Sequence, residues 1–263
     1  IIYTSHINLS NNCFWKLTNK ILTKQNSYII AVCNSVKQLL IKNNYPSNKI
    51  KVIFNGVDFD EKLIKAKPYI RNEFSISEEE FIFVTLTRFS EEKGNMFLLK
   101  SIKYLSNITN IPFRVIFVGD GILLEESKNF VNQNNLKNKV IFTGYRTDTQ
   151  NILDESNVFI NSSSSEALSF AIIEALSRGI PAIVTNVGGN IDIINDRTNC
   201  GLVVNYNDIS GMANAMNTML NEKEIYHNFC KNSREAVKIN FDKSKNFDKT
   251  YDLYLNSIER RKK

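Results

Sequence analysis

The sequence is poor in cysteine, and its cysteines are not spaced to bind a metal ion. The four among 263 residues are Cys13, Cys33, Cys200 and Cys230, and no two of them form a Cys-x-x-Cys pair. We therefore expect no zinc site and interpret them as buried thiols of a protein in a reducing compartment. Internal repeats and low-complexity linkers are also missing.

Long apolar runs are absent as well. No stretch approaches the length that crosses a bilayer, and residues 1–14 lack the basic start of a signal peptide. Hydrophobic residues make up 43% of the chain, which suits a globular core. The length is enough for one large domain or about one and a half typical domains. Because the first residue is Ile1 rather than Met, we expect the natural N-terminus to be missing.

Acidic residues are the minority among the charged ones. The chain has 27 of them against 33 lysines and arginines, which gives a net charge of +6. A mildly basic surface favours anionic partners such as sugar nucleotides, phospholipid headgroups or nucleic acid, and does not choose among them. The interleaved basic and aromatic stripe of a nucleic-acid-binding protein is missing, so we expect no nucleic-acid partner.

From Phe81 onward, apolar strands and amphipathic helices alternate. This alternation predicts an α/β fold with a parallel, doubly wound sheet. The expected strands are 81–86, 114–118, 140–142, 158–160, 182–185 and 201–204, and the expected helices are 96–104, 123–134, 148–155, 190–194 and 208–220, together with a helix after residue 165 or 169.

The flanking regions are less regular. Before residue 81 we expect strands at 1–4, 28–32 and 50–54, helices at 14–25 and 36–42, and a connection between domains at 59–71. The tail, residues 224–261, is predicted to be helical and carries several phenylalanines and tyrosines.

The stretch from Val158 to Gly189 organises the chain. A short apolar strand leads into a loop of small polar residues, and Ser165 or Ser169 can cap the helix that follows. Gly179 and Pro181 end that helix, and the next strand begins at once. Ligands of open α/β sheets bind at the carboxyl ends of strands, where this loop lies.

Two glutamates, Glu166 and Glu174, flank the start of this helix. A helical path of eight residues separates them by at most about 12 Å, roughly the length of a diphosphate with a sugar at each end. The unpaired N–H groups of the helix start suit phosphate. We interpret the pair as a site for a two-ended anionic ligand, with two solvated surface glutamates as the alternative.

A second candidate is the loop Thr87–Gly94, which follows the strand 81–86 and contains Arg88 and Lys93. Cations placed beforehand stabilise a diphosphate that gains negative charge as it leaves. Arginine can bind two phosphate oxygens at once, and lysine acts as a point charge. The alternative is an ordinary solvated charged loop.

These motifs resemble the family 4 retaining glycosyltransferases. The resemblance rests on Glu166-x7-Glu174 with the Ala-Leu-x-x-Gly-x-Pro-Ala and Gly-Gly that follow, and on the segments 52–58 (VIFNGVD), 87–94 (TRFSEEKG), 118–121 (VGDG) and 142–146 (FTGYR). It implies a GT-B fold: a C-terminal Rossmann-like doubly wound parallel sheet plus part of an N-terminal Rossmann-like domain. It covers nearly the whole chain, as about the last two thirds of such an enzyme.

The resemblance also implies domain bounds. Residues 1–66 would be the end of the N-terminal, acceptor-side domain with the connection between domains. Residues 67–235 would be the domain that binds the nucleotide-sugar donor. Residues 236–263 would be a C-terminal helix that returns toward the N-terminal domain.

The same resemblance implies roles for individual residues. Glu166 would bind donor-sugar hydroxyls, Glu174 the ribose, and Arg88 and Lys93 the diphosphate. His6, in Thr4-Ser5-His6, would face the sugar from the opposite domain. The remaining donor-binding residues would be Gly144, Tyr145, Leu168, Ser169 and Phe170; the backbone near Gly144 would lie against the base. Ala167-Leu168-Ser169 departs from the Gly-Phe-Gly that is common in the family, and Asn190-Ile191-Asp192 departs from x-Pro-Glu.

The implied activity is metal-independent transfer of a sugar, with retention, from a UDP- or GDP-linked donor to a saccharide or lipid-linked acceptor. No cofactor is expected, and the expected location is cytoplasmic, with association to the inner face of a membrane left open. The alternative is a non-catalytic nucleotide-sugar binding module or half of a two-chain glycosyltransferase.

Overall fold

The computed structural model describes residues 2–5, 28–65 and 67–259. His6, Cys13 and the helix predicted at 14–25 lie outside these residues. None of the described helices is both long enough and apolar enough to cross a bilayer.

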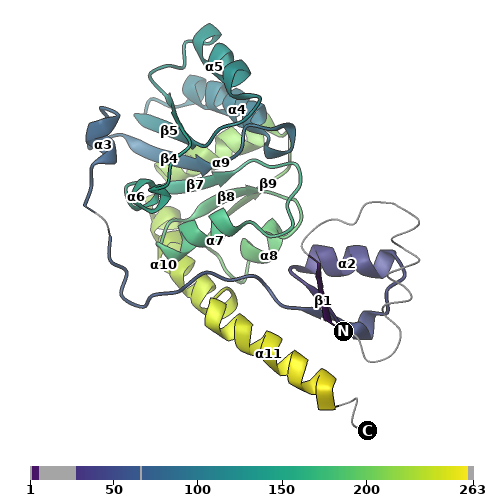
Figure 1. The fold of residues 1–263 in the computed structure, drawn as a ribbon. Coiled ribbons are helices and arrows are strands. Elements are labelled where there is room, and N and C mark those ends of the chain that lie inside the picture. Colours follow the sequence, from purple (N-terminus) through teal and green to yellow (C-terminus); the bar gives the residue numbers. More distant parts are fainter. Residues whose placement is uncertain (1, 6–27, 66, 260–263) are drawn as a thin grey trace.

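The larger lobe is built on a six-stranded parallel sheet, and all six predicted strands are confirmed (Figure 1). The strands run in the order β6-β5-β4-β7-β8-β9, and their bounds are β4 Phe81–Leu86, β5 Phe113–Val118, β6 Val140–Gly144, β7 Val158–Asn161, β8 Ala182–Thr185 and β9 Gly201–Val204. The first strand of this lobe, β4, therefore lies inside the sheet beside the fourth, β7. This is a doubly wound topology, as the alternation predicted.

Helices cover both faces of this sheet, which explains why its strands are apolar on both sides. Along β4, Phe83 packs into one buried cluster, and its neighbours Ile82 and Val84 pack into the other. One face carries α4 (Asn95–Ile108), α5 (Leu124–Gln133) and α9 (Ile209–Asn221), and the other carries α6 (Thr149–Asp154), α7 (Phe170–Ser177) and α8 (Asn190–Ile193).

The smaller lobe holds a three-stranded parallel sheet, β1 (Ile2–Ser5), β2 (Tyr28–Ala31) and β3 (Ile50–Val52), with helix α2 (Asn34–Lys42) after β2. Its core is continuous with one cluster of the larger lobe, because Cys33 and Val36 belong to the same buried cluster as Leu168. On the other side of this small sheet, Leu253 of α11 (Lys243–Glu259) packs with Tyr28 and Ile30.

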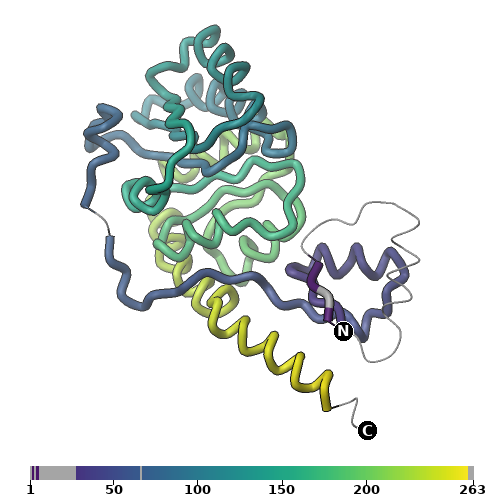
Figure 2. Tube along the Cα trace, in the orientation of Figure 1, coloured from purple at the N-terminus to yellow at the C-terminus, as the bar shows by residue number. Residues whose placement is uncertain are grey.

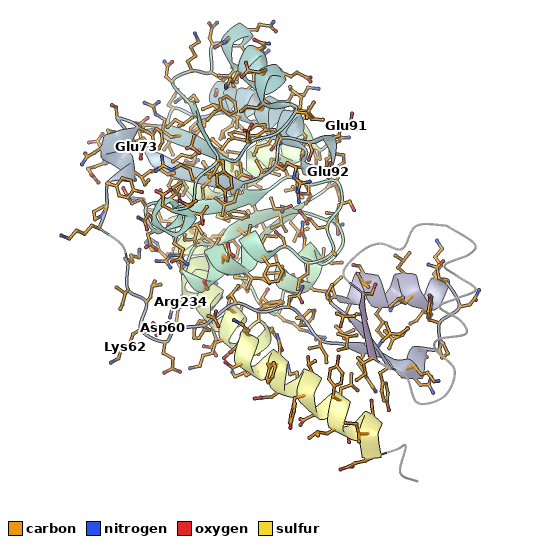
Figure 3. All side chains as sticks on the ribbon, in the orientation of Figure 1. Asp60, Lys62, Glu73, Glu91, Glu92 and Arg234 are labelled. Carbon is orange, nitrogen blue, oxygen red and sulfur yellow. The ribbon has the colours of Figure 1, made fainter. Side chains whose placement is uncertain are left out.

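Arginines of the larger lobe hold the connection between the lobes in place. Arg234 donates to the carbonyl oxygen of Asp60 at 2.6 Å, and Figure 3 shows these two residues side by side. Arg178 forms a buried ion pair with Asp154 and also reaches the carbonyl oxygen of Ile64. The connection then enters α3 (Ile70–Glu73).

The expectation of one helical tail is wrong at a single point. The tail breaks at Phe241-Asp242 into α10 (Lys223–Asn240) and α11. At the break the backbone turns its polar groups to the connection: Val57 N donates to Phe241 O and Lys243 N donates to Val57 O, both at 3.0 Å. Figure 2 shows the connection crossing the tail there. Hydrogen bonds to a distant segment thus replace those of a continuous helix.

The cysteines match their predicted environment in part. Cys33 and Cys200 are buried free thiols, and burial raises the pKa of Cys200 to about 11. Cys230 on α10 is only partly buried.

Candidate functional site

The order of the strands creates a crevice beside β4. The chain continues from β4 to β5 and β6 on one side and then returns to β7 on the other. The loops after β4 and β7 therefore leave neighbouring strands in different directions, and such a switch point is where open α/β sheets bind ligands. The loop after β4 carries Arg88 and Lys93, and the loop after β7 carries Glu166.

Hydrogen bonds to main-chain carbonyl oxygens hold these two loops together. Ser162 Oγ donates to Lys93 O at 2.9 Å, and Ser164 N donates to Glu92 O at 2.8 Å. Gly94 has φ 64°, and a Cβ there would lie 2.1 Å from Ser162 O. Only glycine therefore permits this close approach, which fixes the position of Lys93.

The Glu166 carboxylate lies at the centre of the crevice and is well supported. Its Oε1 receives hydrogen bonds from Lys93 Nζ at 2.7 Å, Ser163 Oγ at 2.7 Å and Asn161 Nδ2 at 3.3 Å. The side chain of Glu166 is 12% exposed and that of Lys93 is 29% exposed. A largely buried carboxylate needs such partners, because the loss of water disfavours its charge.

A cavity of about 300 Å³ opens at this point. It brings together five of the predicted site residues: Lys93, Glu166, Leu168, Ser169 and Phe170. Asn161 and Ser163 also line it, and sequence reasoning did not select them. The available signal was weak: an asparagine and serines directly after a buried apolar strand.

Glu174 lies in a second cavity, of about 690 Å³. This cavity is bounded by α7, by residues 54–58 of the connection and by the start of α11, and Phe170 lines both cavities. Glu174 is exposed at the surface, yet the crowding of protein atoms around its carboxylate raises its pKa. The two glutamates thus face adjoining spaces.

The start of α7 differs in part from the sequence prediction. The helix begins at Phe170 with Ser169 at the N-cap position, so the alternative start at Ser165 is wrong. Glu166 therefore lies in the loop before the helix, and the separation calculated for a helical path does not apply. The loop allows Glu166 to turn back toward Lys93.

Three predicted residues line neither of these two cavities. Arg88 is exposed, and its carbonyl oxygen is held by Asn95 Nδ2 at 2.8 Å. Gly144 has φ 71°, and its carbonyl oxygen accepts a hydrogen bond from Gly119 N at 2.9 Å. Tyr145 is 78% exposed. His6 cannot be placed, because it is outside the described residues.

Comparisons with known proteins show which proteins this chain is similar to. The family model described as "Glycosyl transferases group 1" matches residues 66–236. The chain is 32% identical over 235 residues to the UDP-Gal:alpha-D-GlcNAc-diphosphoundecaprenol alpha-1,3-galactosyltransferase of Escherichia coli. The matched region covers 88% of this chain and 60% of the relative. It is 23% identical over 222 residues to the N-acetyl-alpha-D-glucosaminyl L-malate synthase of Bacillus anthracis, covering 84% of this chain and 58% of that one. The chain thus spans about 60% of the length of these curated relatives.

Solved structures share the fold at low sequence identity. A glycosyltransferase from Rickettsia africae ESF-5 superposes with a TM-score of 0.85 at 22% identity, covering 98% of this chain and 70% of that chain. Anabaena Alr3699/HepE, crystallised with UDP, superposes with a TM-score of 0.85 at 20% identity, covering 97% of this chain and 72% of that chain.

Proposed function

This chain belongs to the glycosyl transferases group 1 family, and we propose that it provides the donor side of a retaining glycosyltransferase. The observation that carries the proposal is the Lys93–Glu166 pair, which lies in the crevice between β4 and β7 and next to the cavity of Glu174. A cation and two carboxylates in adjoining spaces suit a ligand with a diphosphate between two polyols.

Each side chain then has a physical task. Lys93 and Arg88 bind the diphosphate, whose negative charge grows as the sugar leaves. The charge of Lys93 is paired with Glu166. A diphosphate competes for Lys93, and the freed carboxylate accepts hydrogen bonds from hydroxyls of the donor sugar. Glu174 binds the ribose in the second cavity, and Gly144, Tyr145, Leu168, Ser169 and Phe170 contribute further donor contacts.

We also propose the route of the reaction. Retention by the glycosidase route needs a carboxylate nucleophile about 5–5.5 Å from a carboxylic acid. Oε1 of Glu166 accepts hydrogen bonds from Lys93, Ser163 and Asn161. A carboxylate held in this way is better suited to bind sugar hydroxyls than to act as a nucleophile. Front-face attack, in which the departing phosphate helps to deprotonate the acceptor, fits these residues. His6 would contact the sugar from the smaller lobe.

The proposed donor is UDP- or GDP-linked, and the acceptor is a saccharide or a lipid-linked saccharide. The names of relatives support this choice: one acts on a diphosphoundecaprenol-linked sugar, and one structural neighbour was crystallised with UDP. A lipid-linked acceptor would place the protein at the inner face of a membrane. We further propose the division into residues 1–66, 67–235 and 236–263, which the packing of α11 on the small sheet supports.

Calorimetry with free nucleotides tests the proposal. UDP or GDP should bind, and Glu174→Ala should weaken binding by about 1.5–3 kcal/mol, because a charged acceptor for the ribose hydroxyls is lost. Glu79→Ala, which removes an exposed turn glutamate, serves as the control. Equal affinity in both variants would contradict the role of Glu174, and no binding of any nucleotide would contradict the donor site.

The alternative is a nucleotide-sugar binding module, or half of a two-chain enzyme. Transfer assays distinguish the cases. Transfer by the full-length protein supports the enzyme, tight binding without transfer supports the module, and transfer only after a second polypeptide is added supports the two-chain form.

A further inference from the structure

Two asparagines that the sequence did not single out are buried beside Glu166. Asn161 ends β7 and is 8% exposed, and Asn190 begins α8 and is 0% exposed. Buried side-chain amides are uncommon, and each of their polar atoms needs a partner.

The two amides form a chain of hydrogen bonds that ends on Glu166. Asn190 Nδ2 donates to Thr185 O at 3.1 Å and to Asn161 Oδ1 at 3.2 Å. Asn161 Nδ2 in turn donates to Glu166 Oε1 at 3.3 Å and to Ser169 Oγ at 3.5 Å. Asn161 Oδ1 accepts from Asn190 Nδ2 and also from Ser163 N at 3.2 Å, so its NH₂ group faces the carboxylate. Asn190 thus holds the amide that meets Glu166 together with the main chain of Ser163.

This arrangement has an energetic cost that points to a task beyond packing. Asn190 Oδ1 is buried and lacks a hydrogen-bond partner among the described residues. An unsatisfied buried acceptor destabilises a protein by about 1–3 kcal/mol, and an apolar side chain would avoid this. Local rules are broken most often at functional sites, and this one lies one hydrogen-bonded amide away from Glu166.

The same loop also fixes the main chain of the glutamate. Gly189 N donates to Ala167 O at 2.8 Å, and a Cβ on Gly188 would lie 1.6 Å from Glu166 O. The segment after β8 thus packs directly against the backbone of Glu166 and, through Asn190 and Asn161, directs its side chain.

We propose that Asn190 is a positioning residue that, through Asn161, aims the Glu166 carboxylate at the donor sugar. This inference rests on the proposed function. A misdirected Glu166 would bind the sugar less well in the transition state. The affinity for the nucleotide, which Lys93, Arg88 and Glu174 hold, would be unaffected. Small errors in placing a catalytic group can reduce rates by about 10²-fold.

Two substitutions that differ in their effect on packing test the role of the Asn190 amide group itself. Asn190→Leu fills the space, and no acceptor is left empty: Thr185 O keeps Val187 N at 2.8 Å, and Asn161 Oδ1 keeps Ser163 N at 3.2 Å. Asn190→Ala leaves a void and should lower the melting temperature more. If the amide group rather than the packing controls activity, both variants should lose activity to the same extent although their stabilities differ.

The matched control is Asn157→Leu, at the opposite ends of the strands. Asn157 Oδ1 accepts from Ile82 N at 2.8 Å, so its loss lowers stability far from the crevice. In the full-length protein we expect kcat for sugar transfer to fall about 10- to 100-fold in Asn190→Leu and Asn190→Ala. UDP affinity should be unchanged in both, and kcat should be unchanged in Asn157→Leu.

Four outcomes decide the question. Wild-type kcat in both Asn190 variants, or a parallel loss of UDP affinity, would overturn the positioning role. A crystal structure of Asn190→Leu that kept the Asn161–Glu166 hydrogen bond would also overturn it, and this readout needs no activity. If the wild-type protein itself neither bound a nucleotide nor transferred a sugar, the proposed function would fall first.

Discussion

At the scale of single residues, the centre of the site is one carboxylate oxygen with three donors. Glu166 Oε1 meets an ammonium, a hydroxyl and an amide from Lys93, Ser163 and Asn161. The charge of Glu166 is thus compensated by side chains of the protein itself. In the proposed site a diphosphate competes for Lys93, while Ser163 and Asn161 keep the carboxylate in place. Groups held in place beforehand need little reorganisation during a reaction.

Lys93→Met tests this arrangement, because it removes the charge and keeps most of the apolar stem. We expect turnover to fall about 10²-fold, since a cation facing the leaving diphosphate acts mainly in the transition state. The melting temperature should also fall, because the largely buried Glu166 loses its cation and keeps only Ser163 and Asn161. Arg88→Ala, at an exposed side chain, should lower turnover without this loss of stability. A variant that melts early but keeps full turnover would show that its residue is structural.

Glu174 allows a prediction about pH. Crowding around its carboxylate raises its pKa above the ordinary 4.5. A carboxyl group with a raised folded-state pKa binds its proton more tightly in the folded chain than in the unfolded one, so its ionised form lowers stability above that pKa. Glu174→Gln should therefore raise the melting temperature at about pH 7. This gain should fade as the pH falls through the folded-state pKa, because both states are protonated below the unfolded-state value.

Melting curves between about pH 4 and 7 check this sign. Glu79→Gln, at an exposed turn, gives the effect of removing one negative charge alone. A gain for Glu174→Gln that was equal at all pH values would mean that desolvation of the carboxylate is not its cause.

At the scale of elements, short helices depend on partners from elsewhere in the chain. Helix α3 has only four residues, too few to be stable by itself. Glu155, at the end of α6, accepts the backbone N–H groups of Tyr69, Ile70 and Arg71 at 2.6, 2.8 and 3.1 Å. The N–H groups at a helix start have no partner within the helix, and here a distant carboxylate supplies one.

Glu155→Ala should destabilise the chain by about 0.5–2 kcal/mol, the usual effect of losing an N-terminal cap. Glu155→Gln keeps one acceptor oxygen and should lose less. Urea unfolding gives the magnitudes, and faster hydrogen exchange confined to residues 69–71 would locate the effect. Unchanged exchange there would show that α3 is held by packing alone, for example by the buried Ile70.

At the scale of the whole molecule, a pair of hydrogen bonds joins the two lobes directly. Asn34 N and Asn34 Nδ2, at the start of α2, donate to the two carboxylate oxygens of Asp192 on α8 at 2.7 and 2.8 Å. The bridge thus caps a helix of the smaller lobe with an acid of the larger one. Bonds from Arg234 and Arg178 hold the connection at Asp60 and Ile64. We therefore expect any hinge motion to occur where residues 54–58 meet the break in the tail, with the two segments moving together because Val57 is bonded to Phe241 and Lys243.

Asp192→Ala should favour a more open molecule, since it removes both hydrogen bonds between the lobes at this point. Small-angle scattering should show a larger radius of gyration without ligand, and the larger lobe should keep its melting temperature. Asp196→Ala, at an exposed acid on the same segment, is the control. An identical radius of gyration for both variants would mean that the shared apolar core, rather than this bridge, keeps the lobes together.

The sequence by itself determined the larger sheet and the neighbourhood of the site. Six apolar runs separated by amphipathic segments allow few folds other than a parallel sheet covered on both faces. The carboxyl ends of such strands meet at one edge, so the loops with Lys93 and Glu166 had to lie at the same edge of the sheet. These inferences need only the local pattern of apolar residues and the connectivity of the chain.

Only the tertiary structure decided which atoms meet. Lys93 and Glu166 are 73 residues apart, Asn161 and Asn190 are 29 apart, and Arg234 and Asp60 are 174 apart. No spacing rule connects such pairs, because their contact depends on how strands, loops and helices pack together. For the same reason the sequence extended one helix across Phe241-Asp242 and put Glu166 on a helical path. The hydrogen bonds of Val57 break the first helix, and Glu166 lies in the loop before α7.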